Sequence, residues 1–168
     1  MRDRFPGDLV LHPVALASLS LLIVNDHYLK EHFGGPITGK LSDVAGIVFF
    51  PVLMVSTLEV ARLLSGRRPR NLATRGLTAS VVVTGLVFLL AKTWPPATAF
   101  FRLGTGIAEW PAYAVRGLFT RTGLPGLPSA HLVRDHTDLF VLPLLIIPWW
   151  IGEQRIRQIS AREPSTHP

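Results

Sequence analysis

The stretch VAGIVFFPVLMVSTLEVARLL, residues 44–64, decides the fold class of this chain. It contains two charged side chains, Glu59 and Arg62, and both lie near its end. At about 1.5 Å of rise per residue, an α-helix of this length reaches roughly 31 Å and can cross the hydrocarbon core of a bilayer. The stretch therefore predicts a membrane-spanning helix.

Three further apolar blocks, residues 9–24, 77–91 and 139–151, predict three more spans. Glycine and proline at positions 34–36 are expected to end the first helix at Phe33, and Trp94 with two prolines is expected to close the third. The sequence thus predicts an all-α integral membrane protein with one transmembrane domain, residues 1–168. Its four transmembrane helices are expected at about residues 9–33, 42–65, 75–94 and 137–154.

The composition is typical of a protein embedded in a lipid bilayer. Hydrophobic types make up 48% of the residues and charged types 17%, while the mean hydropathy is +0.36. The formal net charge of +6 comes from basic residues in the connections between apolar blocks, a distribution ordinary for membrane proteins, so no nucleic-acid partner is expected. The chain has no cysteine, which excludes disulfides and thiolate chemistry.

The segment at residues 97–121 is harder to assign. Arg102, Glu109 and Arg116 recur every seven residues and would share one face of a continuous helix, but Pro111 and several glycines interrupt the pattern. We expect two short interfacial or re-entrant helices here, with a fifth span as the alternative.

Basic residues predict the orientation. The connection between the second and third spans is dense in arginine, and the C-terminal tail adds three more. The positive-inside rule then places this connection and both termini in the cytoplasm, with the protein in the cell membrane.

With this topology, four polar groups are expected to meet at the outer membrane face. Ionisable groups at the hydrocarbon boundary are costly unless they are paired or functional. The candidate catalytic residues are Asp26, His27, Asp43 and Asp138. The candidate binding residues are Asn25, Lys30, Lys40, Lys92, Arg102, Arg134, Asp135 and His136.

Three chemistries suit this set: proton transfer, metal binding and the binding of an anionic ligand. His27 beside Asp26 could transfer protons or bind a metal ion, with Asp43 and Asp138 as partners. The sequence contains no ligand motif whose spacing indicates a particular metal or cofactor. Arginines on the outer side favour an anionic, lipid-linked ligand.

Each group also has a structural interpretation. Asp26 and Lys30 could form a simple helix-face ion pair, and Lys92 could extend to the lipid head groups. Ser42 with Asp43, and Asp135 with Asp138, could cap helix starts.

Three functions remain open on the sequence. The first is a small membrane enzyme or binding protein that acts on an anionic, lipid-linked substrate. The second is a non-catalytic subunit that packs against other membrane proteins. The third is a transporter, which would need homo-oligomers to form a pathway. Membrane lipids are expected partners in each case.

Overall fold

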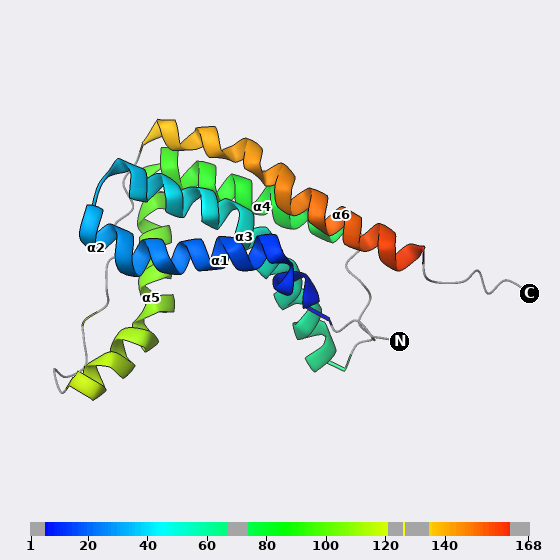
Figure 1. Cartoon of the computed structure of the whole chain (residues 1–168), viewed down its shortest axis with the longest axis horizontal. Coiled ribbons are helices and arrows are strands. Elements are labelled where there is room, and N and C mark those ends of the chain that lie inside the picture. The colour runs from blue at the N-terminus through cyan, green and yellow to red at the C-terminus, as the bar shows by residue number, and fades with distance from the viewer. Residues whose placement is uncertain (1–5, 67–73, 121–125, 127–134, 162–168) are drawn as a thin grey trace, which may run out of the picture. The chain divides into compact units, whose positions relative to one another are not determined.

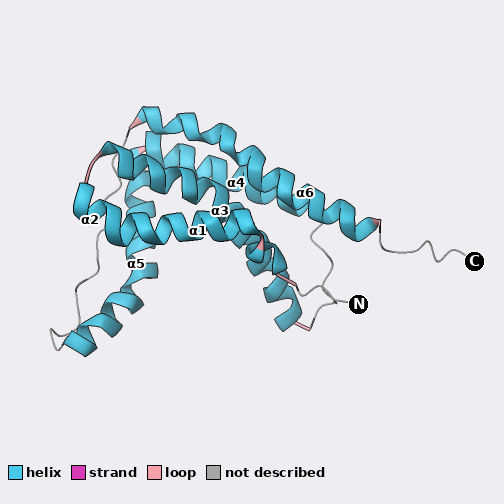
Figure 2. Ribbon diagram, in the orientation of Figure 1, coloured by secondary structure: helices cyan, strands magenta, loops and turns pink. Residues whose placement is uncertain are grey.

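The structure is a computed structural model that describes residues 6–66, 74–120, 126 and 135–161. Those residues are almost entirely helical, and no strand occurs among them (Figures 1 and 2). Within this part of the chain, three helices are long and apolar enough to cross a membrane: Pro36–Leu64, Arg75–Thr93 and His136–Gln158. They correspond to the second, third and fourth predicted spans.

The first predicted span forms a helix in three parts. After a short 3-10 helix η1 (Asp8–Leu11), α1 (Pro13–Val24) runs into a π-helical turn η2 (Asn25–Leu29) and then α2 (Lys30–Phe33). The end at Phe33 was predicted correctly, but this helix is not among the three candidate spans. A total of four spans therefore stays a prediction.

Helix α3 (Pro36–Leu64) begins six residues earlier than predicted. Pro36 takes the first helical position, where its missing N–H leaves no hydrogen bond unmade. Ser42 and Asp43 consequently lie inside α3, and their interpretation as caps of its start is wrong.

Helix α4 (Thr74–Thr93) matches the third predicted span, and α5 (Pro95–Thr120) follows it after Trp94 alone. The expectation of two short helices in this region is wrong, because α5 continues through Pro111. Pro95 again serves as a helix start rather than only as a stop.

The chain divides into two compact units. The larger holds residues 1–86 and 140–168, and the smaller holds residues 87–139. In the larger unit, α1 lies along α3, and α6 (Ile146–Ser160) also packs on α3 (Figure 1). The 3-10 helix η3 (His136–Leu145) leads into α6, and residues 136–139 of η3 belong to the smaller unit. The core of this unit contains Leu9, Ala15, Phe49, Val52, Val55, Leu77 and Ile151.

Glycines allow close packing of α4 against α6 and against the end of η3 within the larger unit. A Cβ atom added at Gly152 would lie 2.5 Å from Leu77 Cδ2, and one added at Gly85 would lie 2.8 Å from Leu145 Cδ1. Small residues at such crossings let helix backbones approach each other, as is common in membrane bundles.

Candidate functional site

The π-helical turn η2 contains the first group of predicted site residues. Its wider winding bonds the N–H of Lys30 to the carbonyl oxygen of Asn25, five residues earlier. Such turns are rare and occur frequently at functional sites. The turn places Asn25 in the interior, with no exposed surface, while Asp26 and His27 are exposed.

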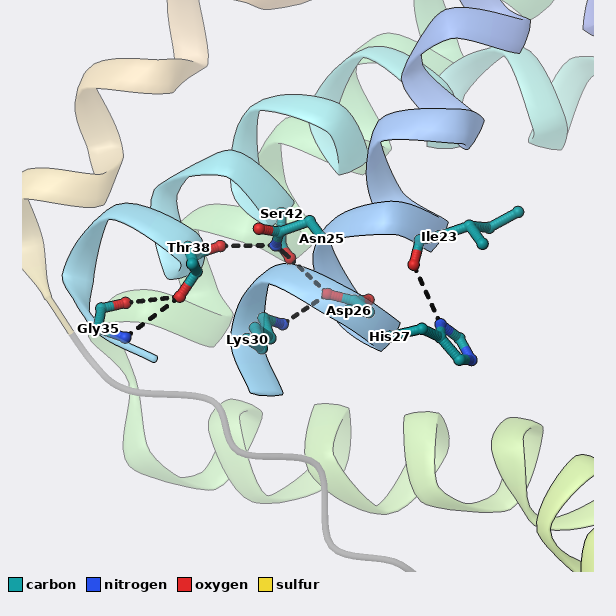
Figure 3. Close-up of polar contacts among 8 residues, drawn as sticks. All are labelled: Ile23, Asn25, Asp26, His27, Lys30, Gly35, Thr38 and Ser42. Carbon is teal, nitrogen blue, oxygen red and sulfur yellow. Dashed lines mark hydrogen bonds and ion pairs between the residues drawn. The ribbon is translucent and has the colours of Figure 1, made fainter. Parts of the chain in front are cut away.

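Asn25 joins the first helix to α3 through its side-chain amide (Figure 3). Its Nδ2 donates to Thr38 O at 2.7 Å and to Ser42 Oγ at 2.6 Å. A carbonyl oxygen can only accept a hydrogen bond, so Thr38 O fixes the orientation of the amide. Asn25 Oδ1 is buried and has no hydrogen-bond partner among the described residues.

Ser42 continues the network to the surface. Its Oγ donates to Asp26 Oδ1 at 2.7 Å, and the same carboxylate oxygen lies 2.7 Å from Lys30 Nζ. The side chains of Asp26 and Lys30 are each 41% exposed. Asp26 is thus held on one side by Ser42, which connects it to the buried Asn25, and on the other by a solvent-accessible lysine.

His27 makes a local contact. Its Nδ1 lies 3.1 Å from Ile23 O on its own helix, and Figure 3 shows the ring directed away from the Ser42–Asp26 hydrogen bond. Because Ile23 O only accepts, this hydrogen bond requires the proton on Nδ1 and leaves Nε2 as the acceptor in the neutral ring.

Lys40 and Asp43 are half-buried on α3, near this network in sequence. Both make polar interactions, so neither is a free charge.

The smaller unit holds a second group. Lys92 Nζ, at the end of α4, lies 2.7 Å from Asp138 Oδ2, and both side chains are almost completely buried. The ammonium also lies 5.5 Å from the centre of the Phe88 ring, within range of a cation–π interaction. The expectation that Lys92 simply extends to the head groups is therefore wrong.

Asp135 serves the start of η3. Its Oδ1 accepts a hydrogen bond from Thr137 N at 2.8 Å, and its carbonyl oxygen accepts one from Asp138 N at 3.1 Å. This is the capping role that the sequence allowed. His136 is exposed, Arg102 is half-buried on α5, and Arg134 lies outside the described residues.

The predicted site residues therefore form two sets, one in each unit: Asn25, Asp26 and Lys30 with Ser42, and Lys92 with Asp138. Their meeting at one membrane surface stays a prediction. Within the described chain, no group of three or more histidine, aspartate or glutamate side chains is placed to hold a metal ion.

Sequence reasoning missed a third polar cluster, which lies in the larger unit. Arg155 Nη1 donates to Glu59 Oε1 at 3.1 Å, and Arg155 also forms an ion pair with Asp8. Gly7 N donates to Glu59 Oε2 at 2.7 Å. Glu59 was the available signal, because a carboxylate within an apolar span needs a cationic or hydrogen-bonding partner.

Comparison with known proteins adds no assignment to this geometry: no family model, curated protein or solved structure matches the chain.

Proposed function

We propose that the chain is a multi-pass protein of the cell membrane, and that the polar cluster at its π-helical turn binds the anionic group of a lipid-linked molecule at the outer membrane face. Here the polar cluster means Asn25, Asp26, Lys30 and Ser42.

Membrane insertion is supported by the surface of the larger unit. Apolar side chains on its candidate spans are exposed, where a protein in water would present polar groups; examples are Phe50, Leu53, Val82, Val83 and Ile146. Lipid is the solvent in which such faces are stable.

The arrangement of Lys30 carries the binding proposal. Its ion pair with Asp26 is solvent-accessible, and exposed pairs of this kind contribute only about 0–1 kcal/mol. Asp26 keeps its hydrogen bond from Ser42 when the lysine leaves. Lys30 can therefore exchange its carboxylate partner for a phosphate at small cost, while the buried Asn25 keeps the turn in place.

Binding of short-chain, soluble phosphatidylglycerol to the purified full-length protein in detergent tests the proposal. The apparent Kd is compared with that for short-chain phosphatidylcholine, at fixed ionic strength. Lys30→Gln should weaken the preference for the anionic lipid about tenfold, since it removes the cation. Asp26→Asn should preserve or strengthen it, because the lysine then loses its internal competitor.

The control is Glu31→Gln, which changes an exposed charge next to the cluster. Unchanged selectivity in a folded Lys30→Gln protein would refute the proposed role of the cluster. A gain in anionic-lipid binding for Glu31→Gln as large as that for Asp26→Asn would indicate non-specific electrostatic attraction instead.

A non-catalytic subunit is the second candidate, and α5 favours it. The heptad spacing of Arg102, Glu109 and Arg116 predicts that these positions share one face of the helix. Large apolar side chains elsewhere on the helix are exposed, including Phe100 at 75% and Phe119 at 86%. A partner helix would cover this surface, and co-purification of a stoichiometric second protein in mild detergent would support the subunit function.

A further inference from the structure

A cavity in the larger unit lies beside the cluster of Asp8, Glu59 and Arg155. Its volume is about 220 Å³, and its polar lining comes from Asp8, His12, Gln154, Arg155 and Gln158. Leu9, Leu11 and Ile151 supply the apolar part of the wall. None of these residues belongs to the proposed head-group site at the π-helical turn.

We infer that this cavity binds a primary ammonium group, supplied either by the head group of phosphatidylethanolamine or by a small free alkylamine. Asp8 is the counter-ion of the ammonium group. The glutamine side chains accept its remaining hydrogen bonds.

The charges of Asp8, Glu59 and Arg155 indicate that the ligand is a cation. Glu59 is nearly completely buried and engages Arg155 through both carboxylate oxygens, at 3.1 and 3.4 Å from Nη1. Among the residues that the structure describes, one arginine thus faces two carboxylates, and the buried Glu59 already neutralises it. Asp8, whose side chain is 28% exposed, supplies the surplus negative charge at the cavity wall.

The backbone holds this arrangement in place. Gly7 adopts a left-handed conformation with φ of 87°, and its N–H donates to Glu59 Oε2. A Cβ atom at Gly7 would lie 2.9 Å from Val60 Cγ2, so the glycine permits close approach to α3. Asp8, the next residue, is thereby positioned against Arg155 independently of any ligand.

The remaining lining distinguishes a primary amine from other cations. An ammonium group has three N–H donors, and the oxygens of Asp8, Gln154 and Gln158 are acceptors that can match them. A quaternary ammonium prefers a cage of tryptophan, tyrosine or phenylalanine rings, and none of these lines the cavity among the described residues. The volume suits a head group rather than a drug-sized ligand, because pockets for drug-sized ligands measure about 300–1,000 Å³.

Short-chain soluble lipids provide the test. The Kd is measured for dihexanoyl phosphatidylethanolamine, phosphatidylcholine and phosphatidylglycerol, and for free ethanolamine. The full-length protein carries Lys30→Gln throughout, so that the proposed head-group site at the π-helical turn does not contribute to phosphatidylglycerol binding. We expect phosphatidylethanolamine to bind at least about tenfold more tightly than the other two lipids. Competition by free ethanolamine would identify the free amine as a sufficient ligand, whereas binding of the lipid alone would identify the head group as the source.

Asp8→Asn removes the surplus charge and retains the shape, and it should weaken binding at least about tenfold. Glu153→Gln is the matched control, because Glu153 is on the same helix as Arg155 but does not line the cavity, and it should leave the Kd unchanged. Gln158→Leu keeps the charges of Asp8, Glu59 and Arg155 and should weaken binding about threefold or more, since it removes a hydrogen-bond acceptor from the cavity wall.

Equal affinity for phosphatidylglycerol, or unchanged binding in a folded Asp8→Asn protein, would overturn the inference. Should Asp8→Asn fail to fold, unchanged binding in Gln158→Leu would overturn it equally. The inference would also be overturned if neither phosphatidylethanolamine nor ethanolamine binds.

Discussion

Lys92 and Asp138 form an ion pair across 46 positions of sequence, with 2.7 Å between Nζ and Oδ2 and with only 4% and 8% of their side chains exposed. Removing two charges from water is expensive, and their attraction offsets this cost only when both partners are present. The pair therefore fixes where the end of α4 meets the start of η3 within the smaller unit.

Breaking this pair should be more harmful than replacing it. Asp138→Leu alone leaves a buried ammonium without its carboxylate, and we expect the free energy of unfolding to fall by about 3–5 kcal/mol. Lys92→Met together with Asp138→Leu should recover most of that loss. Equilibrium unfolding of the purified variants in detergent gives both values, and Lys30→Met at the exposed Asp26 pair is the control, with an expected change below about 1 kcal/mol. A double variant as unstable as the single one would show that the pair does more than neutralise charge.

The amide of Asn25 should be essential for attaching the first helix to α3. Asn25→Leu removes the hydrogen bonds to Thr38 O and Ser42 Oγ, and we expect a loss of about 1–3 kcal/mol in unfolding free energy. Asn25→Asp should be worse, because it directs a buried carboxylate at the carbonyl oxygen of Thr38.

Ser65→Ala is the matched control for this experiment. Ser65 also donates through its Oγ, but it is exposed at the end of α3 and bonds to Ala61 O of its own helix. Its replacement should change stability by less than about 0.5 kcal/mol. A loss for Asn25→Leu no larger than that of the control would contradict the proposed attachment.

Helix ends were predictable from sequence where a residue acts through its own backbone. The glycines after Phe33 stop the first helix, and Trp94 marks the end of α4, as expected. Proline was interpreted only as a residue that ends a helix, and this interpretation missed that proline can also begin one. Pro36 and Pro95 each begin the next helix, so α3 is longer than predicted and α5 follows α4 at once.

Contacts between residues far apart in the chain could not be predicted from the sequence. The spacing of Asp26 and Lys30 predicted their ion pair, but nothing local indicates that Asn25 reaches Thr38 or that Asp8 reaches Arg155. Such contacts depend on helix packing and on the π-helical turn, which has no periodic signature. The long-range partners of a candidate site therefore have to come from the structure.

Packing of α4 against α6 should depend on the absence of a side chain at Gly152. Gly152→Ala would place a Cβ atom 2.5 Å from Leu77 Cδ2, and Leu77 is almost completely buried, so it has little room to move. We expect a loss of about 1–3 kcal/mol. Gly104→Ala on α5, where a Cβ atom meets nothing within 4 Å, should be neutral or stabilising by up to about 1 kcal/mol.

A double-mutant cycle identifies the cause. In a Leu77→Ala background, the cost of Gly152→Ala should largely disappear, because the clashing atoms have been removed. Unfolding midpoints of the four proteins in detergent supply the coupling energy. Additive losses would mean that Leu77 is not the residue that limits the size of position 152.

The orientation on which the head-group site depends can be tested by single cysteines, because the chain has none of its own. Positions 32, 136 and 157 carry exposed side chains, so a thiol there should be accessible to water. For a topology with four spans, the arginine-rich connection at residues 62–75 predicts that position 157 lies in the cytoplasm and that positions 32 and 136 lie outside. In intact cells, a membrane-impermeant maleimide should therefore modify His32→Cys and His136→Cys, and it should modify Arg157→Cys only after permeabilisation. Protection of His32→Cys together with labelling of His136→Cys would place the π-helical turn and Asp138 on opposite sides, and the polar cluster could not then act with Asp138 at an outer surface.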